Sequence, residues 1–246
     1  MKALVLAGGK GSRLRDQPTG PPKPLMQVGG KCLMDFSLQN AVTIGATDIV
    51  VVVSAFTEGV INHYGSSYRG IPITYKIQNE PKGVVHAIEC AAGALNDADF
   101  MLMLADEIVL DASHGDMLER FRREGLFAVL GVVPVEDRTQ ISKTYSILAD
   151  SVSGRIHRLI EKPRYPHNNI MGTGNCVFRS AMLSYIDVCP INQARGEKEL
   201  PDLIQCAVDD GHEVKTHRVG AYYVNVNASD DFRAAYDLLA SHASRL

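Results

Sequence analysis

The sequence predicts an α/β fold, a Rossmann-like three-layer sandwich in which a mostly parallel mixed sheet lies between helices. Short β-branched runs alternate along its 246 residues with longer amphipathic segments, an order typical of βαβ units. Two of these runs, Ile49–Val53 and Met101–Leu104, are apolar throughout, as expected of strands covered on both faces. The chain has no internal repeat, low-complexity tract or linker, so we expect one domain over residues 1–246.

The expected elements follow one another along the whole chain. The strands are short and mostly apolar: Ala3–Leu6, Asp48–Val53, Ile73–Gln78, Phe100–Ala105, Phe127–Val133 and Thr144–Leu148. The helices are the amphipathic segments Leu33–Ala46, Phe56–Tyr64, Val84–Ala94, Gly115–Glu124, Ser180–Ile186 and Asp230–Ser244. From about Phe127 onward the chain is richer in β signals, which predicts a lobe on the same sheet rather than a separate unit.

Composition excludes several classes of protein. A formal net charge of -3 argues against a nucleic-acid-binding surface, so any functional cations must be locally concentrated. No apolar run approaches the ~20 residues that span a bilayer, and the N-terminus lacks the apolar length of a signal peptide. The five cysteines are scattered and lack CxxC spacing, which predicts isolated reduced thiols in a cytoplasmic protein and no zinc site.

The first expected strand ends in a glycine-rich, basic turn, Ala7–Arg13, with the sequence AGGKGSR. Ligands of open α/β sheets bind at the carboxyl ends of strands, and glycines let backbone N–H groups approach an anion. Lys10 adds charge, and Arg13 can pair with phosphate oxygens through two hydrogen bonds. The turn lacks the GK[ST] ending of a P-loop and the GxGxxG spacing of a dinucleotide fold. Alone, it is also compatible with a simple tight turn.

A second lysine, Lys23, stands between two prolines in the segment PKPL. Proline restricts its own backbone and that of the preceding residue, so this lysine should be presented by a stiff loop. Two basic loops close in sequence indicate a ligand with several negative charges.

LAGGKGSRL followed by PKPL resembles the sugar-phosphate nucleotidylyltransferases, also called nucleotide-sugar pyrophosphorylases. Further segments match that family in order: IQNEPKG at 77–83, LAD at 104–106, LIEKP at 159–163, GEKELPD at 196–202, and YVNVN at 223–227 followed by SDDF at 229–232. The resemblance runs from residue 1 to about 240. It implies the nucleotide-diphospho-sugar transferase fold, with a nucleotide-binding half (about 1–125) and an acceptor-binding half (about 126–246). Many relatives carry a C-terminal β-helix domain, which we do not expect here.

The resemblance implies transfer of a nucleotidyl group from a nucleoside triphosphate to a sugar 1-phosphate, with release of pyrophosphate. The acceptor oxygen is already anionic, so catalysis would consist of positioning two polyanions and stabilising charge. The implied catalytic residues are Arg13, Lys23 and Lys162. The implied nucleotide-binding residues are Leu6, Ala7, Gly8, Gly9, Lys10, Gly11, Ser12, Gln78, Pro81 and Gly83. Gln78 could instead be an ordinary surface residue of its strand.

The same resemblance implies acceptor contacts from Tyr145, Glu161, Gly174 and Asn175. Glu161 could equally form an ordinary ion pair with Arg158 or Lys162. The eight histidines lack metal-like spacing, and His86, on an expected helix, is read as structural.

The cofactor that the resemblance implies is Mg²⁺, with Asp106 as one ligand. Asp106 could alternatively be a helix N-cap or a solvent-facing strand end. The second ligand position, commonly aspartate in the family, is Asn225 here, and Asn227 is the fallback two residues on. Glu107 should point away from Asp106, to the opposite side of the strand.

Other assignments remain open. A cytidylyltransferase acting on phosphocholine or a phosphonate would fit the same fold, and LADE differs from the LGDN common in hexose enzymes. A molybdopterin guanylyltransferase, a non-catalytic sensor and a NAD-dependent dehydrogenase fit less well. A homo-oligomer is compatible with the family, but no segment of the sequence indicates a subunit interface. The base and the phosphorylated acceptor stay undetermined.

Overall fold

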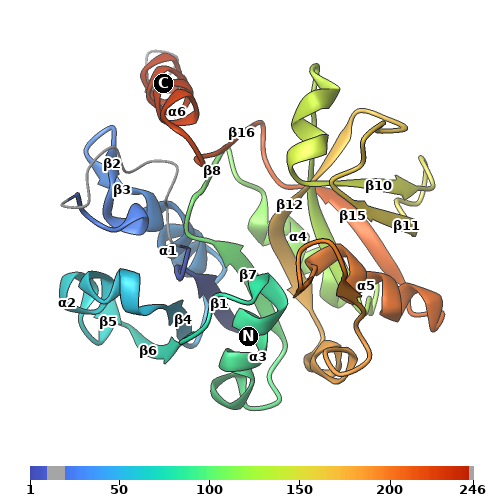
Figure 1. The fold of residues 1–246 in the computed structure, drawn as a ribbon, viewed down its shortest axis with the longest axis horizontal. Coiled ribbons are helices and arrows are strands. Elements are labelled where there is room, and N and C mark those ends of the chain that lie inside the picture. The colour runs from blue at the N-terminus through green and yellow to red at the C-terminus, as the bar shows by residue number, and fades with distance from the viewer. Residues whose placement is uncertain (10–19, 244–246) are drawn as a thin grey trace.

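The structure, a computed structural model, describes residues 1–9 and 20–243 (Figure 1). Within them, one central sheet of ten strands has the order β11-β10-β12-β7-β1-β4-β6-β5, with β9 joined to β12 and β15 joined to β9. Its strands are β1 Lys2–Leu6, β4 Ile49–Val53, β5 Ser67–Tyr68, β6 Ile71–Ile77, β7 Phe100–Leu104, β9 Ala128–Pro134, β10 Tyr145–Ala149, β11 Ile156–Glu161, β12 Ile170–Phe178 and β15 Val214–Arg218. Short two-stranded pairs complete the β structure: β2 Gln27–Val28 with β3 Lys31–Cys32, β8 Glu107–Leu110 with β16 Tyr222–Asn225, and β13 Ile191–Asn192 with β14 Glu197–Lys198.

Helices cover both faces of the sheet: α1 Leu33–Thr43, α2 Gly59–Tyr64, α3 Gly83–Leu95, α4 His114–Arg123, α5 Leu200–Asp209 and α6 Ser229–Ala243. Alternation of side chains along each strand divides the core. Val5 and Met103 pack with α1 and α4 on one face, whereas Leu4 and Leu102 pack with α3 and α5 on the other. The predicted α/β class and three-layer arrangement are confirmed.

The sheet is mixed because its two halves are built differently. Strands β7, β1, β4 and β6 are mutually parallel, whereas β12 runs antiparallel to both β7 and β9. The pairing of β12 with β7 joins the C-terminal half to the parallel sheet. The expected β-rich lobe therefore extends the same sheet.

Several elements differ from the prediction. Segment 180–186 was expected to be an α-helix, but Ser180–Tyr185 forms a 3₁₀ helix that follows strand β12 directly. Other 3₁₀ helices lie at Lys23–Leu25, Ala55–Thr57 and Arg138–Lys143. Helix α5 was not predicted as an element, nor were strands β11, β12, β15 and β16. Strand β12 has six non-β-branched residues among its nine, IMGTGNCVF, so propensity alone does not reveal it.

The carboxyl ends of β1, β6 and β7 meet at one edge of the parallel sheet because these strands run in the same direction. Gly8, Gln78 and Asp106 each follow one of these strands within two residues.

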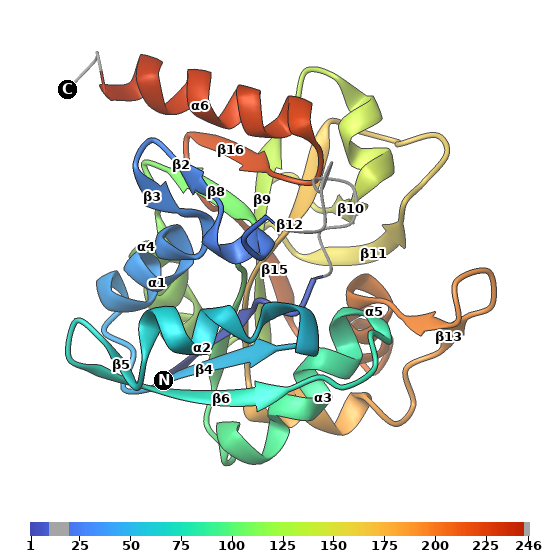
Figure 2. The same cartoon turned by 60° about the vertical axis from the view of Figure 1, so that its left-hand side comes forward.

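Figure 2 shows α6 lying over β16, where its Phe232, Ala235 and Leu239 join a small apolar cluster. Of the helices described, none combines the length and apolar character that crossing a membrane requires.

Candidate active site

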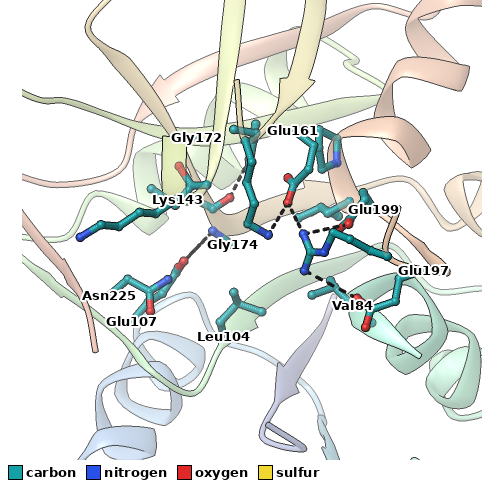
Figure 3. A pocket seen from close by; sticks show the side chains of 18 residues that line it. Val84, Leu104, Glu107, Lys143, Glu161, Gly172, Gly174, Glu197, Glu199 and Asn225 are labelled. Carbon is teal, nitrogen blue, oxygen red and sulfur yellow. Dashed lines mark hydrogen bonds and ion pairs between the residues drawn. The ribbon is translucent and has the colours of Figure 1, made fainter. Parts of the chain in front are cut away.

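Two adjoining hollows lie along this edge of the sheet. The first, called the Gln78 hollow, is lined by Leu6, Gly8, Gly9, Gln78, Pro81, Gly83, Val84, Ala87, Leu104, Asp106 and Glu197. The second, called the Glu161 hollow, is lined by Gly83, Val84, Leu104, Glu107, Lys143, Thr144, Tyr145, Glu161, Lys162, Gly172, Thr173, Gly174, Arg195, Glu197, Glu199, Leu200, Pro201 and Asn225 (Figure 3). Four lining residues are shared, so the hollows form one continuous cleft.

In the Gln78 hollow, a buried amide faces a glycine turn. Gln78 Nε2 donates to the Gly83 carbonyl at 3.0 Å, and Gln78 Oε1 faces Gly8, where an added Cβ would lie 3.3 Å from it. Gly83 has φ +87°, and a Cβ there would lie 2.9 Å from Glu197 Oε2. Glycine is thus required at position 83 for both its backbone conformation and its close contact.

Lys23, Asp106 and two asparagines are linked side chain to side chain. Lys23 Nζ donates to Asp106 Oδ2 and, at 3.0 Å, to Asn227 Oδ1. Asn227 Nδ2 in turn donates to Asn225 Oδ1 at 2.9 Å. Lys23 is buried, and pairing with a carboxylate offsets the cost of removing its charge from water.

Backbone pairing explains why these distant residues meet. Strand β16 runs antiparallel to β8 with Asn225 opposite Glu107, and the Val226 N–H donates to the Asp106 carbonyl at 2.9 Å. Asp106 lines the Gln78 hollow and Asn225 lines the Glu161 hollow, so the pair spans the boundary between them. Lys23 reaches Asp106 from the 3₁₀ helix Lys23–Leu25.

The Glu161 hollow concentrates charge of both signs (Figure 3). Lys162 Nζ donates to Glu161 Oε1 at 2.7 Å, and Arg195 Nη1 donates to the same oxygen at 3.1 Å. Lys162 is held at φ +41°, a backbone conformation that is costly for a side chain larger than glycine, while its N–H donates to the Thr144 carbonyl at 2.7 Å. Such strain is common where a side chain must be aimed at a ligand.

Arg195 connects three carboxylates of this hollow. Besides Glu161, its Nη1 lies 2.9 Å from Glu199 Oε1, and its Nη2 lies 3.8 Å from Glu197 Oε2. The Arg195–Glu199 pair is an ion pair without hydrogen-bond alignment, since none of the described residues donates a hydrogen bond to that buried oxygen. Burial and the neighbouring Glu161 raise the pKa of Glu199. A dianionic group entering here would find two cations already in place.

A buried carboxyl, Glu107, forms the floor of the Glu161 hollow. It accepts hydrogen bonds from the Gly174 N–H at 2.9 Å, from Asn175 Nδ2 at 2.7 Å and from the Tyr223 hydroxyl at 2.6 Å. Burial, partly offset by the Tyr223 hydrogen bond, raises the pKa of Glu107 to about 8. Asp106 and Glu107 have different partners, since Asp106 pairs with Lys23 whereas Glu107 lines the Glu161 hollow and is bound by Gly174, Asn175 and Tyr223.

Comparison with known proteins shows the family of the chain. The family model described as "Nucleotidyl transferase" matches residues 2–241, nearly the whole chain. The chain belongs to the nucleotidyl transferase family. A curated relative, the UTP–glucose-1-phosphate uridylyltransferase AglF of Haloferax volcanii, is 36% identical over 232 residues, covering 94% of this chain and 93% of the relative. A glucose-1-phosphate thymidylyltransferase of Streptomyces griseus is 29% identical, covering 91% of this chain and 61% of its own length.

Solved structures share the fold of this nucleotidyl transferase. A UDP-glucose pyrophosphorylase complexed with UDP-glucose superposes with a TM-score of 0.88 at 16% identity, covering 98% of each chain. A UTP-bound UGPase of Acinetobacter baumannii gives a TM-score of 0.82 at 18% identity, covering 97% of this chain and 92% of its own. At these identities the likeness establishes the fold alone.

The nucleotidyl transferase brings most of the predicted site residues into one cleft. Leu6, Gly8, Gly9, Gln78, Pro81 and Gly83 line the Gln78 hollow, and Tyr145, Glu161, Lys162 and Gly174 line the other. Ala7 is buried behind the first hollow. Arg13, with Lys10, Gly11 and Ser12, lies outside the described residues.

Two predicted acceptor contacts have their polar atoms engaged within the protein. The Tyr145 hydroxyl donates to the Thr173 carbonyl at 2.7 Å, so the ring rather than the hydroxyl lines the hollow. Asn175 is buried and does not line the hollow, since its amide connects Glu107 to His114, whose Nε2 lies 2.8 Å from Asn175 Oδ1. Asn175 therefore supports the floor of the hollow.

Arg195, Lys143 and Glu107 are among the residues of the cleft that were not predicted as site residues. Lys143 ends a 3₁₀ helix, and its side chain extends along the Asn225 side of the hollow (Figure 3). Arg195 directly precedes the GEKELPD segment. Its position next to that motif was the one feature of the sequence that could have predicted Arg195 as a site residue.

Proposed function

We propose that this nucleotidyl transferase joins a nucleoside triphosphate to a sugar 1-phosphate, giving a nucleotide-sugar and pyrophosphate. An oxygen of the acceptor phosphate attacks the α-phosphorus, the bond from that phosphorus to the oxygen bridging to the β-phosphate breaks, and pyrophosphate leaves. The names of the relatives, which include uridylyl- and thymidylyltransferases of glucose 1-phosphate, support this choice.

The observation that carries the proposal is the placement of cations on both sides of one cleft. Lys23 reaches Asp106 at the edge of the Gln78 hollow, while Lys162 and Arg195 stand together in the Glu161 hollow. In the reaction, Lys162 and Arg195 would hold the acceptor phosphate, and Lys23 would offset charge near the α-phosphate. Positioning and charge stabilisation of this kind suffice when the attacking oxygen is already an anion.

Hydroxyl groups of the sugar would meet the remaining groups of the Glu161 hollow. Glu161, 13% exposed at its side chain, can accept hydrogen bonds once the acceptor phosphate draws Lys162 and Arg195 toward itself. The Thr144 hydroxyl, buried in the wall and without a hydrogen-bond partner among the described residues, is a further donor and acceptor. The face of Tyr145 would support an apolar face of the sugar ring.

The donor set at the boundary of the hollows fits Mg²⁺. Asp106 offers a carboxylate and Asn225 an amide oxygen, with Asn227 as the alternative, and Mg²⁺ commonly binds one or two such protein oxygens together with phosphates and water. Among residues 1–9 and 20–243, no cluster of three His, Cys, Asp or Glu side chains forms a site that would hold a metal without such help. Bound there, the ion would neutralise phosphate charge where the two substrates meet.

Release of pyrophosphate tests the proposal. Purified protein with Mg²⁺ is assayed with UTP, dTTP, GTP, CTP and ATP against glucose 1-phosphate, mannose 1-phosphate, phosphocholine and a phosphonate. Turnover is expected with at least one sugar 1-phosphate. Turnover confined to CTP with phosphocholine or the phosphonate would replace the proposal by the cytidylyltransferase alternative.

A further inference from the structure

His86, on the first turn of helix α3, forms a close contact with the amide of Gln78 that no part of the proposed reaction uses. Gln78 Nε2 lies 3.0 Å from His86 Nδ1 and 3.0 Å from the Gly83 carbonyl oxygen. His86 Nε2 lies 3.8 Å from Cys90 Sγ, one turn further along the helix. Gln78 itself is buried, so its orientation is decided by these neighbours rather than by solvent.

Hydrogen-bonding chemistry fixes which end of the amide faces which neighbour. A backbone carbonyl can only accept, so the Gln78 atom beside Gly83 must be the NH₂ group. Its second hydrogen then meets His86 Nδ1, which must accept and is therefore unprotonated. The other ring nitrogen carries the hydrogen and faces the weak acceptor Cys90 Sγ. The contacts of His86 are consistent with this single tautomer.

This arrangement leaves the Gln78 oxygen directed toward the cleft. Oε1 faces Gly8, and none of the described protein groups donates a hydrogen bond to it. An amide turned by 180° would place its oxygen against the Gly83 carbonyl oxygen and give up two hydrogen bonds. The hollow therefore presents a fixed acceptor, not an adaptable amide.

We propose that His86 is a specificity-determining positioning residue, which locks Gln78 so that the enzyme selects bases carrying an N–H at the centre of their Watson–Crick edge. Uracil and thymine present N3–H and guanine presents N1–H, whereas cytosine N3 and adenine N1 are lone-pair acceptors that would face the Gln78 oxygen. A buried acceptor left unpaired disfavours the wrong base. The inference rests on the proposed function, since it places the base in the Gln78 hollow.

The test compares UTP with CTP, which differ on this edge of the pyrimidine, in the wild type and in two variants of similar shape. His86→Leu removes one of the two acceptors of Gln78 Nε2 and leaves the Gly83 carbonyl. In this variant, turning the Gln78 amide so that its NH₂ group faces CTP costs one hydrogen bond rather than two. His86→Asp keeps an acceptor-only oxygen near the position of Nδ1. The kcat/KM ratio of UTP to CTP should be about 10- to 100-fold in the wild type, fall about fivefold in the leucine variant and return to within about twofold of the wild-type value in the aspartate variant.

If His86 had a purely structural role, its replacement would change kcat/KM for UTP and for CTP by the same factor. The ratio of the two values would then stay the same. An unchanged ratio in His86→Leu, or equal use of UTP and CTP by the wild type, would overturn the inference. Titration calorimetry of UTP and CTP without acceptor gives the same ratio where a variant turns over too slowly. If the wild type binds UTP over CTP in that titration yet forms no product with any acceptor, the proposed function fails while this inference stands.

Discussion

Arg195 and Lys162 contact the same oxygen of Glu161, an arrangement that holds two cations ready on one side of the cleft. Each alone could bind a phosphate, but Arg195 also carries the ion pair to Glu199. Its removal therefore changes both the proposed phosphate site and the charge balance among three carboxylates. Arg195 is more than a surface residue of its loop, although 39% of its side chain is exposed.

Arg195→Ala is expected to raise the KM for the sugar 1-phosphate by roughly 10- to 100-fold, the loss typical of hydrogen bonds to a charged group. The KM for the triphosphate should change little because Arg195 does not line the Gln78 hollow. Steady-state kinetics with each substrate varied in turn measures the difference. Arg122→Ala, an exposed position on α4 outside both hollows, is the control. Equal changes in both KM values would argue against a phosphate-binding role.

Asp106→Asn keeps the shape of the side chain but removes its charge. We expect turnover to fall by a factor of roughly 100 or more, because the variant weakens the proposed metal site and leaves buried Lys23 without its anionic partner. The wild type should lose activity in excess EDTA and regain it with added Mg²⁺. Asp187→Asn, at an exposed residue outside the hollows, serves as the control. Full wild-type activity in EDTA would remove the metal from the account.

At the scale of elements, strand β12 carries the wall of the Glu161 hollow on residues that admit no larger side chain. A Cβ at Gly174 would lie 2.3 Å from Leu104 Cγ, and one at Gly172 would lie 2.0 Å from the Tyr145 ring. The strand can therefore approach β7 and β10 only with glycine at these positions. Close packing of backbone against side chains brings the Gly174 N–H to Glu107.

Gly174→Ala is expected to lower the free energy of unfolding by about 1–3 kcal/mol, the usual effect of overpacking a well-filled core. Gly93→Ala is the matched control, since a Cβ at Gly93 on helix α3 meets nothing within 4 Å. That control should raise the free energy of unfolding by about 0.5–1 kcal/mol, because alanine favours helix over glycine. Urea denaturation of both variants measures the difference, and equal stabilities would contradict the crowding at Gly174.

A buried histidine, His114, connects helix α4 to strand β12 by a hydrogen bond. His114 donates from Nε2 to Asn175 Oδ1, because the Asn175 NH₂ already donates to Glu107. Within the described part of the chain, His114 Nδ1 has no hydrogen-bond partner. Burial lowers the pKa of His114 below its usual value. The folded protein therefore holds a neutral ring where the unfolded chain would bind a proton.

The sign of the pH dependence follows from this depressed pKa. The stabilisation by neutral His114 is fully present above about pH 6.5 and is lost as the pH falls, by up to about 1.4 kcal/mol per pH unit. His114→Gln retains a donor to Asn175 but cannot titrate. Urea unfolding at pH 7.5 and 5.5 should show a steeper loss of stability in the wild type than in the variant. Parallel losses would mean that His114 does not contribute to acid sensitivity.

At the scale of the whole molecule, the sequence located the parts of the cleft that immediately follow strand ends. Gly8, Gln78 and Asp106 could be predicted because apolar strands are easy to recognise and parallel strands end at one edge. Lys23 could be predicted because its prolines mark a stiff loop, and the match of several ordered motifs placed Glu161 and Lys162.

Other parts depend on contacts that no local pattern encodes. Arg195 acts through three carboxylates brought together by β11, β14 and the start of helix α5. Strand β11, on which helix α5 packs, was not predicted as an element. The family resemblance predicted Asn175 as an acceptor contact, yet its side chain points into the core toward His114. Side-chain direction on an unpredicted strand is set by register, which the sequence of that strand alone does not give.

The central claim is that one cleft holds the nucleotide in the Gln78 hollow and the phosphorylated acceptor in the Glu161 hollow. A crystal structure with UDP-glucose and Mg²⁺ bound measures this directly. We expect the uracil against Gln78 Oε1, the hexose beside Glu161 and the phosphates between Lys23 and the Lys162–Arg195 pair. A nucleotide-sugar bound with its base in the Glu161 hollow, or away from the cleft, would contradict the account.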